Sequence, residues 1–173
     1  GTKCVNQEGK IINLSFSGYK TSKLPSIKLK ISANLHKLIT PLGINVTDNL
    51  DIKLNHTWIT VDAGEIAYED GIKAQVEGGF IQAASWSLYE EVLFDSKEII
   101  SKDWDSYKII GFDNIPIFTT NVIDKKGYPY LGVGEVVAGP TGAAISNALC
   151  HALGQRIKTL PFTKDNITKE LLN

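Results

Sequence analysis

The stretch GIKAQVEGGFIQAASWSLYEEVLF, residues 71–94, decides the fold class because it is a long segment with a helical pattern. Its apolar side chains recur at three- and four-residue spacing, at Ile72, Val76, Phe80, Ala83, Ala84 and Leu88. This spacing is typical of the buried face of an amphipathic helix. The pair Gly78–Gly79 weakens a helix by roughly 1 kcal/mol per glycine relative to alanine. We therefore expect a helix whose small-residue face packs very closely against another segment.

Alternating apolar residues on both sides of this helix predict strands. The expected strands are Lys10–Phe16, Ser26–Leu35, Leu50–Asp62 and Pro116–Asp124. Clusters of Pro, Gly, Asn and Asp predict loops at Thr40–Asn49, Ala63–Gly71 and Lys125–Pro129. Residues 96–115 are expected to be irregular, and 157–162 to form a short strand or an extended tail.

A second, alanine-rich helix is expected over Thr141–Leu153, with Pro140 near its start and Gly154 at its end. Thr163 is a candidate N-cap for a last short helix. Together these elements predict an α+β fold, in which a mixed or antiparallel sheet has two main helices packed on one face. The length of 173 residues predicts a single domain over residues 1–173.

The composition argues against several classes of partner. A formal net charge of −1 gives no general attraction to nucleic acid or to an anionic membrane. No apolar run approaches the ~20 residues of a membrane span. Two distant cysteines, Cys4 and Cys150, and three scattered histidines predict neither a disulfide framework nor a metal site held by the protein. No signal peptide is visible, so we expect a cytoplasmic location, with the periplasm as the alternative.

One candidate site is an acid between two glycine-rich stretches. Glu135 ends Gly132-Val133-Gly134-Glu135 and precedes Gly139-Pro140-Thr141-Gly142 at the predicted helix start. Glycine lets the backbone approach a ligand, and a helix N-terminus stabilises negative charge. A carboxylate placed there is a candidate general base. The alternatives are an ordinary loop with a solvated glutamate and a small-molecule site at the 139–142 helix start.

A second candidate is Gln82, one turn beyond the glycine pair. Its amide can both donate and accept a hydrogen bond, which suits the polar edge of a ligand. The alternative is a close helix packing site with Gln82 exposed to solvent. Three acids near the helix end, Glu90, Glu91 and Asp95, lie where the helix dipole disfavours negative charge. We expect these acids to be solvated and assign them no catalysis.

Taken in order, four stretches of residues 58–163 resemble the large subunits of the molybdenum hydroxylases, the family of xanthine dehydrogenase and aldehyde oxidase. The nicotinate and isoquinoline dehydrogenases look most similar. The stretches are Trp58–Gly64, Asp70–Gln82 continuing through Leu88–Asp95, Lys102–Tyr107 with Phe112–Pro116, and Tyr130–Glu135 followed by Gly139–Ala148 and Leu160–Thr163. No single motif is specific, but their order and spacing are.

The resemblance implies a site and a chemistry. A glutamate beside the molybdenum centre would act as general base in the hydroxylation of an aldehyde or N-heteroaromatic carbon with water-derived oxygen, and the matching residue is Glu135. Gln82, Val133 and Gly134 match positions at the molybdopterin cofactor. The cofactor is expected in its cytosine dinucleotide form. Electrons would leave through [2Fe–2S] clusters on another subunit or domain, since this chain lacks cysteines for them.

Size limits what this chain is expected to do alone. The family's large subunits are several times longer, so residues 1–173 resemble a C-terminal fragment, in which β-rich residues 1–57 match poorly. One segment cannot enclose a pterin dinucleotide. We therefore expect no tightly bound cofactor and no chemistry without the rest of the large subunit. The rival hypothesis is a structural or interaction domain that binds no metal.

Overall fold

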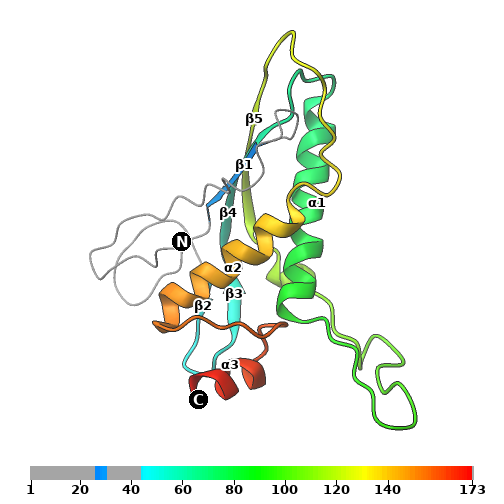
Figure 1. Ribbon diagram of the computed structural model, residues 1–173, viewed down its shortest axis with the longest axis vertical. Helices are drawn as coiled ribbons and strands as arrows, with labels where there is room; N and C mark the ends of the chain where they lie inside the picture. The colour runs from blue at the N-terminus through cyan, green and yellow to red at the C-terminus, as the bar shows by residue number, and fades with distance from the viewer. Residues whose placement is uncertain (1–25, 31–43, 173) are drawn as a thin grey trace.

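The computed structural model describes residues 26–30 and 44–172, which form a small sheet, a separate strand pair and three helices (Figure 1). The strand predicted at Lys10–Phe16 lies outside the described residues, as do residues 31–35 of the strand predicted from Ser26. The α+β class is confirmed. None of the described helices combines the length and hydropathy needed to cross a bilayer.

The three-stranded sheet is mixed. Its central strand, β4 (His56–Asp62), pairs antiparallel with β1 (Ser26–Lys30) and parallel with β5 (Ile117–Ile123). Because parallel strands need a long crossover connection, the chain passes through a helix between β4 and β5. Of the two alternatives predicted from the sequence, a mixed or an antiparallel sheet, the structure has the mixed one.

Two short strands correct the expectations for residues 40–62. Ile44–Val46 forms β2, inside the predicted loop, and pairs with β3 (Ile52–Leu54). Ile44 is buried and anchors β2 in the core. The Pro, Gly, Asn and Asp residues around it had indicated a loop instead. The predicted strand Leu50–Asp62 is interrupted at Asn55, so β3 and β4 belong to different sheets.

The first long helix, α1 (Glu69–Leu88), ends six residues before the expected Phe94. The amide N–H groups of Tyr89 and Glu90 both donate to the carbonyl of Ser85, and the helical pattern stops there. The side chains of Val92, Leu93 and Phe94, which continue the apolar sequence, are exposed. They have no core to pack against, so no burial stabilises a longer helix.

The other two helices follow the predicted order. Helix α2 (Ala138–Leu153) begins three residues earlier than expected and ends at Gly154, which has the left-handed φ of 73° typical of a C-cap. Helix α3 (Lys164–Leu171) begins after Thr163, whose hydroxyl accepts from the Asn166 N–H, as predicted for an N-cap. Residues 157–162 form no strand, which leaves the expected extended tail.

The core lies between β4 and the two long helices (Figure 1). Alternate β4 side chains, Ile59 and Val61, are buried in the same cluster as Phe80 of α1 and Ile145 of α2. Phe80 also meets Phe118 of β5 edge to face, with ring centroids 5.4 Å apart. Both helices therefore cover the same face of β4, which agrees with the predicted arrangement.

Between α1 and β5 the chain leaves the body of the molecule. Residues 90–110, which we call the arm, extend away from the lower end of α1 (Figure 1). The arm contains an isolated bridge between Phe94 and Ile99 and no longer strand. The irregular structure predicted for residues 96–115 is confirmed, apart from a single turn of 3-10 helix at Phe112–Asn114.

Candidate functional site

Glu135 lies on the segment that joins β5 to α2, residues 124–137, which we call the linker. The turn between β4 and α1 holds the first half of this linker. The backbone N–H of Leu131 donates to the Ala63 carbonyl at 3.0 Å, and that of Lys125 donates to the Gly64 carbonyl at 3.1 Å. The Gly127 N–H donates to the Glu65 carboxylate at 2.9 Å. The β4–α1 turn therefore fixes the path that leads to Glu135.

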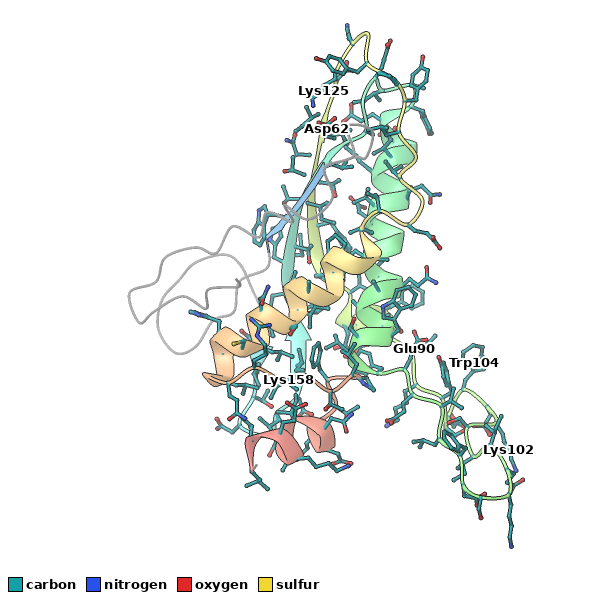
Figure 2. All side chains as sticks on the ribbon, in the orientation of Figure 1. Asp62, Glu90, Lys102, Trp104, Lys125 and Lys158 are labelled. Carbon is teal, nitrogen blue, oxygen red and sulfur yellow. The ribbon has the colours of Figure 1, made fainter. Side chains whose placement is uncertain are left out.

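An ion pair and a glycine tighten this contact. Lys125 pairs with the buried Asp62 at the end of β4 (Figure 2). Hydrogen bonding from Lys125 lowers the pKa of Asp62 below its ordinary value near 3.8, against the opposing effect of burial. Gly64 has a φ of +76°, and a Cβ built there would lie 2.0 Å from the Pro129 carbonyl oxygen. A side chain at position 64 would therefore displace the linker.

The second half of the linker crosses α1 at Gly79. A Cβ at Gly79 would lie 2.8 Å from Cγ1 of Val137 and 3.8 Å from the Gly134 carbonyl oxygen. The close packing predicted for the small-residue face therefore occurs at Gly79. Gly78 takes no part, because a Cβ there would meet nothing within 4 Å.

The predicted base, Glu135, is exposed, and its side chain forms no hydrogen bond or ion pair with the described residues. Its carbonyl accepts from the Ala138 N–H at 3.1 Å, at the start of α2. Gly134 beside it is exposed, and Val133 is half-buried against the core. The linker therefore directs a carboxylate and an open stretch of backbone away from the core.

Gln82 is exposed on α1, one turn beyond the Gly79 contact. Gln75 lies one turn before Gly79, and its Oε1 is 4.0 Å from the position of a Cβ at Gly134. Residues 75, 79 and 82 share one helix face because they are separated by four and three positions. The structure therefore places the linker along this face, between two exposed amides.

Sequence reasoning missed Gln75, although its seven-residue separation from Gln82 could have indicated it. It also placed Gly139 before the helix, which was expected to begin at Thr141 and begins at Ala138. Gly139 and Gly142 both lie inside α2, and a Cβ at Gly142 would approach the Ser87 hydroxyl of α1 to 3.3 Å. Gly142 serves helix packing, which weakens the alternative of a ligand site at the predicted helix start.

The three acids near the end of α1 form no catalytic pair. Glu90 accepts a hydrogen bond from the Tyr107 hydroxyl at 2.7 Å, and Asp95 accepts from two backbone N–H groups of the arm. The single arginine, Arg156, donates to Asn147 of α2 at 2.9 Å. Glu91 and Asp95 are exposed, as expected for solvated acids, whereas Glu90 is half-buried.

The open face around Glu135 suits an organic cofactor that carries its own metal ion. The described residues contain no cluster of His, Cys, Asp and Glu that could hold a metal ion. Around the linker, Cβ atoms at Gly78, Gly132 and Gly139 would meet nothing within 4 Å, so internal packing does not require these glycines. Two exposed amides offer donors and acceptors to a polar ring edge.

The sequence of this chain was compared with protein-family models and with known proteins. Residues 46–116 match the model of the molybdopterin cofactor-binding domain. The chain is 31% identical over 121 residues to a nicotinate dehydrogenase subunit of Pseudomonas putida, which covers 70% of this chain. It is 28% identical over 131 residues to the beta subunit of isoquinoline 1-oxidoreductase of Brevundimonas diminuta, which covers 75%. The chain belongs to the molybdenum hydroxylase family.

Solved structures of molybdenum hydroxylases share the fold. Quinoline 2-oxidoreductase from Pseudomonas putida matches 86% of this chain with a TM-score of 0.67 and 20% identity, over 18% of its own length. The aldehyde oxidoreductase of Desulfovibrio desulfuricans matches 69% with a TM-score of 0.60 and 23% identity, over 13% of its length. The chain spans 10% of the nicotinate dehydrogenase subunit and 16% of the isoquinoline one, a small part of each.

Proposed function

We propose that this chain supplies one wall of the molybdopterin site in an oxidoreductase that hydroxylates an aldehyde or N-heteroaromatic carbon with water-derived oxygen. Glu135 is the general base of that reaction. The observation that carries the proposal is the position of Glu135. It is an exposed carboxylate on a linker held at two places, by the β4–α1 turn and by Gly79. The geometry fixes the backbone of this residue and leaves its side chain available.

Each residue of the site has a distinct task in this proposal. The Glu135 carboxylate accepts the proton that water-derived oxygen gives up as it bonds to the substrate carbon. Gln82 hydrogen-bonds the pterin edge, and Val133 and Gly134 bring backbone close to the cofactor. Gln75, on the same helix face, is a further candidate for a pterin contact. When bound, the molybdenum centre supplies Lewis acidity and accepts the two electrons of the oxidation.

The complete assembly needs other components. In this proposal, the rest of the large subunit encloses the cofactor, in its cytosine dinucleotide form. A subunit or domain with [2Fe–2S] clusters takes the electrons away. The rival function is a structural or interaction domain without metal.

The test is a Glu135→Gln substitution in the complete natural enzyme that contains this segment. We expect molybdenum content to stay unchanged and kcat for the aldehyde or N-heterocycle to fall about a hundredfold or more, in the range of general-base catalysis. Asp165→Asn is the matched control, because it also removes one exposed carboxylate near a helix start. It should leave kcat unchanged.

Two results would contradict the proposal. If kcat of the Glu135→Gln enzyme stays within about twofold of the wild type, Glu135 is not the base. If the wild-type assembly contains no molybdenum by elemental analysis, the structural-domain alternative replaces the enzyme.

A further inference from the structure

The arm has a fixed shape although it projects from the body of the molecule. Figure 2 shows Glu90 where the arm leaves α1, Trp104 beyond it and Lys102 farther out. The Ser85 hydroxyl of α1 accepts from the Ile110 N–H at 3.0 Å, and Glu90 accepts from the Tyr107 hydroxyl. These two bonds hold both ends of the arm near the end of α1.

Polar groups also hold the arm together internally. The Ile100 N–H donates to the Leu93 carbonyl at 2.7 Å, and the Leu93 N–H donates to the Ser101 hydroxyl at 2.9 Å. Farther out, the Ser106 hydroxyl donates to the Asp103 carboxylate at 2.7 Å. A segment with this many local bonds is ordered before it meets anything else, which lowers the entropy cost of binding.

The polar groups of the arm are hydrogen-bonded to one another, but its large apolar side chains are exposed and pack against little. Phe94 is 74% exposed, Trp104 76% and Ile99 55%. Phe94 and Ile99 form the isolated bridge, so they lie side by side in the arm. Large exposed apolar groups gathered on an ordered projection mark an interaction surface, in which aromatic side chains commonly carry much of the binding energy.

We propose that the arm docks into an apolar cleft on the remainder of the molybdopterin-binding subunit, with Phe94, Ile99 and Trp104 as its buried contacts. Two observations select this partner. The chain spans only 10% and 16% of two relatives, so in the proposed assembly most of the subunit lies outside this chain. The second is charge. Residues 90–108 carry six carboxylates and three lysines, which suits a cleft bordered by basic side chains.

This inference rests on the proposed assembly with the rest of the large subunit, but not on the role of Glu135. The test is photo-crosslinking of the complete enzyme that carries Trp104→p-benzoylphenylalanine. We expect crosslinked peptides from the large subunit outside this segment. Crosslinks to a second copy, crosslinks to the iron–sulfur component, or no crosslink would each overturn the inference. The same substitution at Leu172, an exposed apolar residue outside the arm, is the control.

A second measurement uses hydrogen exchange of the Ile100 amide in the complete enzyme. If Trp104 is buried in the cleft, Trp104→Ser should accelerate this exchange about tenfold or more, and Leu172→Ser should not. Equal exchange in both variants would overturn the inference. Activity of the Glu135→Gln enzyme distinguishes the two proposals. If Glu135→Gln abolishes activity and the arm forms no crosslink, Glu135 remains the proposed base and the docking proposal fails. If the arm forms the crosslink and Glu135→Gln keeps its activity, the docking proposal remains and the base assignment fails.

Discussion

Gly64 and Gly127, a glycine of the linker, have similar positive φ values and different surroundings. Gly64 and Gly127 have φ values of +76° and +80°. A Cβ at Gly127 would meet nothing within 4 Å, whereas one at Gly64 would collide with the Pro129 carbonyl oxygen. Substitution at Gly127 therefore measures the free-energy cost of a left-handed backbone alone. Substitution at Gly64 measures that cost together with the cost of displacing the linker.

We predict that Gly127→Ala lowers the free energy of unfolding by about 1 kcal/mol, the usual cost of left-handed backbone for a residue with a Cβ. Gly64→Ala should cost about 1–3 kcal/mol more, because it adds overpacking. It should also reduce kcat in the complete enzyme, since the linker positions Glu135. Urea unfolding of the two variants measures the difference, and equal costs would contradict the steric role of Gly64.

The Asp62–Lys125 pair predicts a pH dependence. The folded-state pKa of Asp62 lies below its ordinary value near 3.8, so the pair stabilises the fold above that pH. Lys125→Ala should therefore lower the thermal midpoint at neutral pH. The difference from wild type should shrink as pH falls below about 3.8, where the unfolded state takes up a proton on Asp62, and should be lost below the lowered native-state pKa of Asp62. Lys126→Ala, at the adjacent exposed lysine, is the control and should show no such pH-dependent difference.

At the scale of elements, the packing of the linker on α1 depends on one of two adjacent glycines. Gly79→Ala should destabilise the fold by about 1–3 kcal/mol, because the buried, β-branched Val137 cannot easily move aside. Gly78→Ala should stabilise it by about 0.5–1 kcal/mol, since alanine favours a helix and the space is open. Denaturant unfolding tests both signs, and destabilisation by both variants would contradict the assignment of the contact to Gly79.

The spacing of apolar residues predicted α1 and its close packing face, but not where the helix ends. The pattern continues into Val92–Phe94, and only the absence of a core beside those residues ends the helix. The order of the motifs selected Glu135 and Gln82. Gly64 was not predicted as part of the site, because its contact with Pro129 joins positions 65 residues apart and leaves no local signal.

At the scale of the whole molecule, the described surface around Glu135 is one open wall. Ligand sites bury most of their ligand, and this face cannot do so alone. We predict that the 173-residue chain binds a molybdopterin more weakly than about 1 mM. Trp86 can report on this, because it is exposed on α1 one turn beyond Gln82. Saturable quenching of its fluorescence at micromolar pterin would show that the chain forms a complete site.

The mixed sheet also has a consequence for the order in which the chain folds. β4 pairs with β5 in a register that joins His56 to Ile117, 61 positions later. Contacts of such long sequence separation are slow to form, because the intervening chain must first give up its freedom. During synthesis, β4 and α1 leave the ribosome well before β5 and the linker. The backbone that carries Glu135 therefore cannot take its place beside the β4–α1 turn until β5 and the linker have been made.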